Sequence, residues 1–383
     1  MRTLIQKGIV LTPNGWFPEA SVVVNDGKIE EITTRKIEGF DGECVDASGC
    51  FVVPGFIDLH VHGGGGYDFM EGTEEAFETV INTHLRHGTT GILITLASSS
   101  LPMIEQAADE TVRRMQNADS PVIGLHLEGP YLNPSMAGGQ MPEYIRKPDP
   151  KEYRMLADRY PCILRWDAAP EMEGALEFGK YLSERGIVVG VAHTTADYAI
   201  MKEAWKYGYV HATHFYNGMK GFHKKGEYKH EGTVESVYLL QDMTVELIAD
   251  GKHVPPAILR LVYQLKGVEK TCLITDAMAP TDSLSTVAFD DRVIIEDGVA
   301  KLADHSALAG SVSTMDKLIR VMVNEVDIPL EDAIRMASES PAKRINIYDR
   351  KGSLQRGKDA DIVLLDAELN VHAVMQMGRL VKK

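Results

Sequence analysis

Eight short apolar segments recur along the middle of the chain, and this recurrence limits the fold more than any other feature of the sequence. Stretches with the apolar spacing of a helix separate most of these segments. The segments occupy residues 51–60, 91–96, 122–128, 162–167, 187–193, 209–214, 245–250 and 272–276. Continuous apolar strands joined by helices are typical of a parallel sheet that is buried on both faces. We therefore predict an α/β fold, a (β/α)8 barrel of the TIM type over residues 53–344.

Helix signals are clearest just after the first apolar segment. Thr73 is a good N-cap, two glutamates follow it in the first turn, and Gly88 ends an amphipathic stretch. Further helices are predicted at residues 171–185, 313–326 and 330–338. An open, doubly wound sheet is the alternative. It is less favoured because no Gly-x-Gly-x-x-Gly sequence follows the first strand.

Both ends of the chain carry shorter strand signals. They lie at residues 3–5, 8–11, 21–25 and 28–32 near the N-terminus, and at 360–365, 371–377 and 379–381 near the C-terminus. The sequence Asn25-Asp26-Gly27 predicts a tight hairpin turn. Because neither end is long enough to bury a core alone, we predict that residues 1–52 and 345–383 pair into one discontinuous β-sandwich domain.

Candidate metal ligands stand where five of the apolar segments end. They are His60 and His62, Glu128, His193, His214 and Asp276. Alternate side chains of a strand point the same way, so the two histidines of the His-x-His pair share a face. The C-terminal ends of barrel strands converge on the face that carries the active site, where such donors suit a divalent metal ion. We expect two other strand histidines, His126 and His211, to lie outside this site.

Each of these candidate ligands also has an ordinary structural explanation. A His-x-His pair can lie at the surface, and a single strand histidine can form a hydrogen bond to backbone in the core. Glu128 can be an ordinary charged residue at the end of a strand. Asp276 is also a good helix N-cap. The agreement of all five positions at one rim favours a metal site over five separate coincidences.

Composition excludes several classes of partner. The formal net charge is -15, with 55 acidic and 40 basic residues, which argues against nucleic acid or an anionic membrane. The four cysteines form no Cys-x-x-Cys pair and are expected to be reduced thiols. The first ten residues lack the apolar core of a signal peptide, and no apolar run approaches the ~20 residues of a spanning helix. We expect a soluble, cytoplasmic protein.

The candidate ligands and the sequences around them resemble the amidohydrolase superfamily and, within it, the family of N-acetylglucosamine-6-phosphate deacetylases. The Pro-Gly-Phe-Ile-Asp-Leu-His-Val-His stretch that ends at His62 is shared by many amidohydrolases. The narrower resemblance is carried by residues 127–131, 213–219, 248–254, 274–280, 308–311 and 357–361. Together these segments extend the resemblance over nearly the whole chain.

The resemblance implies a role for each candidate residue. Family members remove an acetyl group with a metal-bound hydroxide, so the main ion would be held by Glu128, His193 and His214. His60 and His62 would hold a second ion in members that have one, and the metal would be zinc, iron or similar. Asp276 would act as general base and then general acid. The remaining implied residues contact substrate or line its pocket: Gln140, His253, Asn217, Gly218, Leu308, Ala309 and Gly310.

Two positions depart from the family pattern. The family usually has histidine where Gln140 stands. It also usually carries an arginine that grips the substrate phosphate across a dimer interface, whereas residues 223–232 contain no arginine. Counting from His214 points to Lys225 as the replacement, and anchoring on Gly232 points to Lys229. The resemblance also implies a homodimer.

The implied chemistry is consistent with the residues. An amide resists water at neutral pH, so a metal must lower the pKa of water, to about 7 in favourable sites, and a carboxylate must move the proton to the leaving amine. We predict an enzyme of amino sugar metabolism that hydrolyses N-acetylglucosamine 6-phosphate to acetate and glucosamine 6-phosphate. The alternatives are another N-acetyl amino sugar, such as N-acetylgalactosamine 6-phosphate or an unphosphorylated sugar, a cyclic-amide hydrolase, and a scaffold with an inactive barrel.

Overall fold

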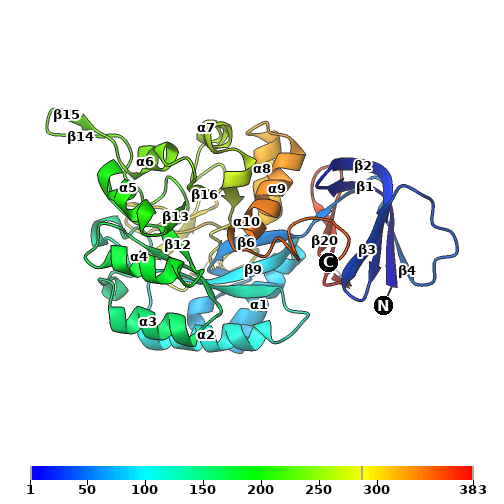
Figure 1. Cartoon of the computed structure of the whole chain (residues 1–383), viewed down its shortest axis with the longest axis horizontal. Helices are drawn as coiled ribbons and strands as arrows, with labels where there is room; N and C mark the ends of the chain where they lie inside the picture. The colour runs from blue at the N-terminus through cyan, green and yellow to red at the C-terminus, as the bar shows by residue number, and fades with distance from the viewer. Residues whose placement is uncertain (1, 286–287, 382–383) are drawn as a thin grey trace.

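The computed structural model describes residues 2–285 and 288–381 and contains a large α/β unit and a smaller β unit (Figure 1). Residues 1, 382 and 383 of the predicted terminal domain lie outside the described residues. The smaller unit brings together the two ends of the chain, coloured blue and red in Figure 1. Among the described residues, no helix is both long and apolar enough to cross a membrane.

The large unit is built on eight parallel strands in the order in which they occur along the chain. They are β6 (Phe56–Val61), β9 (Thr89–Leu96), β10 (Val122–Tyr131), β11 (Ile163–Ala168), β12 (Val188–Val191), β13 (Tyr209–Ala212), β16 (Thr244–Leu247) and β17 (Thr271–Leu273). Backbone bonds from Asp276 N to His60 O and from His62 N to Ala277 O, both 2.9 Å, join the first strand to the segment after the last. The predicted eight strands and the barrel architecture are confirmed.

The first predicted strand, residues 51–60, is in fact two strands in different sheets. β5 (Phe51–Pro54) pairs with strands of the terminal unit, whereas β6 begins the barrel. Gly55 stands at the crossing, where a Cβ atom would lie 2.0 Å from Thr90 Oγ1. A run of apolar residues cannot reveal this division, because both strands are buried.

Helices follow the sequence signals closely. α1 (Glu74–Arg86) starts after Thr73, whose Oγ1 accepts the Ala76 N–H at 3.2 Å, and Gly88 has a left-handed φ of 89°. The predicted helix at 171–185 is shorter, because Gly174 has a φ of 85° and α4 begins after it. The remaining helices are α2 (Leu101–Met115), α3 (Pro150–Arg159), α4 (Ala175–Ser183), α5 (Tyr198–Lys206), α6 (Thr233–Leu239), α7 (Pro256–Lys266), α8 (Met315–Asn324), α9 (Leu330–Ala337) and α10 (Glu339–Arg344).

The terminal unit is a separate sheet with its own core. Its strands are β1 (Arg2–Thr12), β2 (Gly15–Asn25), β3 (Lys28–Thr33), β4 (Glu43–Asp46), β5, β20 (Ile362–Leu365), β21 (Val371–Gln376) and β22 (Arg379–Val381). The predicted turn between β2 and β3 has positive φ at Asp26 (47°) and Gly27 (77°), as the twist of a tight hairpin requires. Val22, Val52 and Ile362 pack in its core, so residues from both ends of the chain stabilise it.

Small elements complete the chain around the barrel. Two short hairpins matter for the site: β14 (His223–Lys225) with β15 (Tyr228–His230), and β18 (Val293–Glu296) with β19 (Val299–Leu302). The first projects from the barrel beyond α5 and α6 (Figure 1). The others are β7 (Gly63–Gly64), β8 (Tyr67–Asp68), and the 3₁₀ helices η1 (Phe69–Glu71), η2 (Pro134–Met136), η3 (Pro142–Tyr144) and η4 (Val268–Lys270).

Candidate metal centre and substrate pocket

The structure brings all six predicted ligands together at the C-terminal ends of the barrel strands. Their donor atoms form two groups of three: His60, His62 and Asp276, and Glu128, His193 and His214. The three ligands from the second half of the barrel, His193, His214 and Asp276, stand just beyond their strands with positive φ values of 44°, 30° and 49°. Such backbone strain is concentrated at functional sites, where the surrounding structure holds it in place.

The Glu128 group is fixed by backbone carbonyls. His193 Nδ1 lies 2.7 Å from Met136 O, and His214 Nδ1 lies 3.1 Å from Asn217 O. A carbonyl only accepts, so each imidazole carries its proton on Nδ1 and turns an Nε2 lone pair inward. The two Nε2 atoms lie 2.9 and 2.8 Å from Glu128 Oε1 and 3.2 Å from each other.

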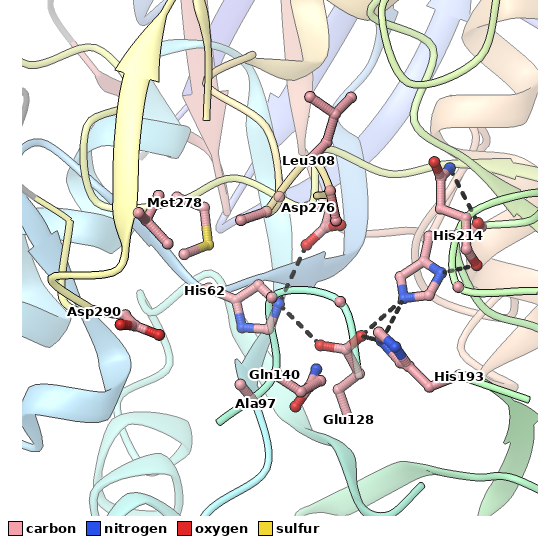
Figure 2. Close-up of a pocket in the computed structure, with 18 of the residues that line it drawn as sticks. His62, Ala97, Glu128, Gln140, His193, His214, Asp276, Met278, Asp290 and Leu308 are labelled. Atoms are coloured by element: carbon pink, nitrogen blue, oxygen red, sulfur yellow. Dashed lines mark hydrogen bonds and ion pairs between the residues drawn. The ribbon is translucent and has the colours of Figure 1, made fainter. Parts of the chain in front are cut away.

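The His60 group lies on the other side of Glu128. His62 Nε2 is 3.2 Å from Asp276 Oδ1 and 3.1 Å from His60 Nε2. The same His62 Nε2 lies 3.2 Å from Glu128 Oε2. Glu128 therefore stands between the groups, with one oxygen toward each (Figure 2).

Both carboxylates of the centre are ionised. Burial would raise the pKa of Glu128, but His60, His193 and His214 hold it well below its usual value. Burial acts the same way on Asp276, and His60 and His62 lower its pKa below the usual value. The centre thus holds two buried carboxylates beside four buried imidazole groups.

This donor set fits a divalent metal ion. In the Glu128 group, the two imidazole Nε2 atoms and a carboxylate oxygen converge on one point. Three such donors with an open fourth position are the pattern of catalytic zinc sites. The arrangement is costly without a cation, because buried lone pairs and charges repel one another unless something compensates them.

A cavity of about 420 Å³ opens above the two groups. It is lined by every predicted substrate residue except the two lysines: Gln140, Asn217, Gly218, His253, Leu308, Ala309 and Gly310. The loops around these residues are tightly fitted, since a Cβ atom on Gly218 would lie 3.0 Å from His193 Nδ1. Met70, Met278 and Phe289 add apolar wall.

Two polar side chains are oriented toward the cavity by buried partners. Gln140 is 4% exposed, and its Oε1 accepts the Ser98 N–H at 2.6 Å, which leaves its NH₂ group to face a ligand. His253 Nδ1 lies 2.8 Å from Asp250 Oδ2. Burial lowers the pKa of His253, but Asp250 more than offsets this and raises it above the ordinary value.

Lys225 and Lys229 do not lie at the cavity of their own chain. Both are exposed on the β14–β15 hairpin, and neither lines the cavity. Among the described residues that do line it, none is a lysine or an arginine.

Two further charged residues at the rim escaped the sequence analysis. Asp290 lines the cavity, and Arg292 pairs with it and donates to Gln140 O at 3.2 Å. Both precede the β18–β19 hairpin, which the sequence pattern does not predict. No motif around them signals a role.

His126 and His211 belong to neither donor group and do not line the cavity, but they lie close to the ligands. His126 lies two residues before Glu128 and so shares its face; its ring lies against His60, with centroids 4.7 Å apart. His211 is fully buried, with Nε2 3.3 Å from Glu246 Oε1. Both belong to a layer directly beneath the ligands. The charged residues inside the apolar strand patterns were the signal that could have revealed it.

Comparison with known proteins gives a consistent result. The chain matches the model of the amidohydrolase family over residues 51–381. N-acetylglucosamine-6-phosphate deacetylase of Lysinibacillus sphaericus is 31% identical over 385 residues, covering 98% of this chain and 97% of that protein. N-acetylgalactosamine-6-phosphate deacetylase of Escherichia coli is 32% identical over 377 residues, covering 97% of each.

Solved structures agree with the sequence relatives. A mutant of N-acetyl-D-glucosamine-6-phosphate deacetylase from Mycobacterium smegmatis, in complex with N-acetyl-D-glucosamine-6-phosphate, matches with a TM-score of 0.91 at 30% identity. N-acetylglucosamine-6-phosphate deacetylase from Pasteurella multocida matches with a TM-score of 0.94 at 28% identity. Each match covers 100% of both chains.

Proposed function

The chain belongs to the amidohydrolase family, and from this premise we propose that it removes the acetyl group of an N-acetylhexosamine 6-phosphate, with N-acetylglucosamine 6-phosphate as the first candidate. The observation that carries the proposal is the pair of donor groups that share Glu128 at the base of a sugar-sized cavity. The family and its deacetylase relatives identify a metal-dependent hydrolase of carbon–nitrogen bonds.

The metal ligands are proposed residue by residue. Glu128, His193 and His214 would hold one divalent ion, and His60 and His62, with Asp276 beside them, a second. A bound ion of this kind supplies the acidity that water lacks and draws charge from the amide carbonyl. Metal analysis of the purified protein would identify the ion as zinc, iron or a similar metal.

The proton transfers are assigned to Asp276. Its carboxylate lines the cavity and is ionised, so it can accept a proton from the attacking water. It then returns that proton to the nitrogen as the carbon–nitrogen bond breaks, because an amine leaves readily only when it departs neutral. The Gln140 NH₂ group and His253 are the donors proposed to stabilise the carbonyl oxygen as it gains charge.

The phosphate contact is proposed to come from a second copy of the chain. Lys225 and Lys229 lie on a hairpin that projects from the barrel, and both Tyr228 on this hairpin (67%) and Phe222 just before it (63%) are exposed. Large apolar side chains on a projecting hairpin suit contact with another protein surface. A lysine binds phosphate as a point charge, without the bidentate fork of arginine, so phosphate selectivity would be weaker.

A cytoplasmic homodimer is part of the same proposal. The four cysteines are unpaired, which fits a reducing compartment. Light scattering of the purified protein checks the dimer, because a dissociated monomer could not deliver its hairpin to a neighbouring cavity.

N-acetylgalactosamine 6-phosphate is a second candidate substrate. The relative that carries this name is as similar as those named for the glucose-configured sugar, at 32% against 31% identity. The two sugars differ only in the configuration of one ring hydroxyl group. Overall similarity therefore favours neither.

Acetate release tests the proposal directly. The metal-loaded protein would be given N-acetylglucosamine and N-acetylgalactosamine, each with and without a 6-phosphate, and a cyclic amide such as dihydroorotate. We expect acetate from at least one phosphorylated sugar, faster than from its unphosphorylated form. Hydrolysis of the cyclic amide alone, or no reaction with any compound, would refute the proposal.

A further inference from the structure

A buried ionic cluster lies directly beneath the candidate metal centre. Arg165, Asp167 and Glu246 point into the barrel from β11 and β16 and are 0% exposed. The Arg165 guanidinium donates to both carboxylates, to Asp167 Oδ2 at 3.0 Å and to Glu246 Oε2 at 3.0 Å. No step of the proposed reaction uses these residues, although burying an arginine with two carboxylates is costly.

Glu246 is the member of this cluster that contacts the metal ligands. Its Oε2 lies 3.3 Å from His60 Nδ1 and accepts the backbone N–H of His214 at 3.2 Å. Its Oε1 accepts from Arg165. Asp167, by contrast, bonds to His126 Nε2 at 2.8 Å and to Thr213, neither of which is a candidate ligand.

The contact fixes the position of a proton. Both oxygens of Glu246 accept from the Arg165 guanidinium, and Oε2 also accepts the His214 N–H, so the carboxylate acts only as an acceptor here. His60 must therefore carry a proton on Nδ1. Its Nε2 lies among His62, Asp276 and Glu128, where a lone pair is needed to bind a cation.

We propose that Glu246 is a positioning residue, which sets the tautomer of His60 and thereby the ion affinity of the His60, His62 and Asp276 group. Arg165 holds the Glu246 carboxylate in place for this role. The inference rests on the proposed metal centre but concerns only one of its two groups. The other group takes its tautomers from backbone carbonyls, so it does not depend on Glu246 in this way.

Glu246→Gln tests the proposal with a side chain of the same shape. Arg165 contacts both oxygens of Glu246 but lies closest to Oε1, so we expect the glutamine oxygen at that position. Its NH₂ group would then face His60 Nδ1, and the His60 proton would move to Nε2. We expect zinc to bind about 10–100-fold more weakly at the His60 group, the usual effect of losing an outer-shell partner. Calorimetric titration of metal-free protein with Zn²⁺ measures the affinity, and anomalous scattering at the zinc edge identifies the group that loses the ion.

Asp167→Asn is the matched control. It also removes one carboxylate from Arg165, but it faces His126 instead of His60. We expect it to lower stability while zinc affinity at both groups stays at the wild-type value. Equal weakening in the two variants would show that the cluster is only structural, and wild-type affinity in Glu246→Gln would also overturn the proposal.

A double substitution keeps the test available if Glu246→Gln does not fold. Arg165→Gln combined with Glu246→Gln removes one positive and one negative charge together, so the net charge of the cluster is unchanged, and Arg165→Gln with Asp167→Asn is its control. Metal binding and acetate release by the wild-type protein distinguish failure of this inference from failure of the proposed function. Acetate release with no ion ever bound at His60 would overturn the inference alone, whereas absence of both metal and acetate release would overturn the proposed function.

Discussion

The ring of strand ends and the β14–β15 hairpin hold the two sets of residues proposed to meet the substrate, and they are built in opposite ways. The six ligands at the strand ends are at most 7% exposed, and buried partners hold several of their side chains. Lys225 and Lys229 are exposed, and Lys229 Nζ lies over the Phe222 ring at 5.4 Å from its centroid.

This difference suits the two regions to different tasks: the strand ends to the chemical step, and the hairpin to substrate specificity. Hydrolysis needs donor atoms held within a few tenths of an ångström, which packed strands can provide. Recognition of a phosphate needs only a cation within reach, which a surface hairpin can supply. Changes at the strand ends should therefore abolish function, whereas changes on the hairpin should adjust it.

Removal of a metal ligand should give the largest effect. His193→Ala or His214→Ala leaves only two donors in the Glu128 group, so we expect loss of its ion and of acetate release. Metal analysis and activity are measured on the same sample. His223→Ala, on the hairpin, is the control and should keep both. Full metal occupancy in either ligand variant would contradict the assignment.

Asp276→Asn should come next, with turnover reduced at least ~100-fold, the low end for a positioned acid–base group. The amide has nearly the same shape but cannot accept the proton from water. The ion of the Glu128 group and substrate affinity should remain, as calorimetry can show. Near-normal turnover would place the general base elsewhere, with Glu128 the first alternative.

A pair of glycines compares how tightly the two regions are packed. Gly190 lies in β12, where a Cβ atom would stand 2.0 Å from Asp167 Oδ1, whereas a Cβ on Gly226 in the hairpin would meet nothing within 4 Å. We expect Gly190→Ala to lower the free energy of unfolding by about 3 kcal/mol through overpacking. Gly226→Ala should cost about 1 kcal/mol, for its φ of 63° alone. Urea denaturation gives both values, and equal costs would contradict this view of the packing.

Loss of the hairpin cations should give the smallest effect. With both Lys225 and Lys229 changed to alanine, we expect KM for the 6-phosphorylated sugar to rise about tenfold, as for the loss of ~1.4 kcal/mol. Activity on the unphosphorylated sugar should not change. Arg292→Ala is the comparison, because Arg292 lies at the rim but is already paired with Asp290. A larger effect from Arg292→Ala would move the phosphate contact to that residue.

Much of the barrel could be predicted because its signals are local. Apolar runs located all eight strands, and the ligands followed as the polar residues near the ends of these runs; Glu128 lies inside β10, which continues to Tyr131. β12 and β13 each stop two residues before His193 and His214, which a pattern of burial cannot resolve. The caps at Thr73 and Gly88 set the limits of α1 for the same local reason.

The remaining features depend on contacts between distant residues. Arg165 and Glu246 lie in different strands, and only the closed barrel brings them to His60. The Ser98 partner of Gln140 is likewise remote in sequence. The family resemblance indicates Lys225 and Lys229, but their distance from the cavity of their own chain depends on the path of the hairpin.

The most direct test of the account is to remove and restore metal in the wild-type protein. A chelator would strip the ions, and Zn²⁺ would then be titrated while ions bound per chain and acetate released from N-acetylglucosamine 6-phosphate are measured in the same samples. We predict that the stripped protein releases no acetate and that release returns as the Glu128, His193 and His214 group fills. Full turnover by the stripped protein, or filled sites without any acetate release, would contradict the account.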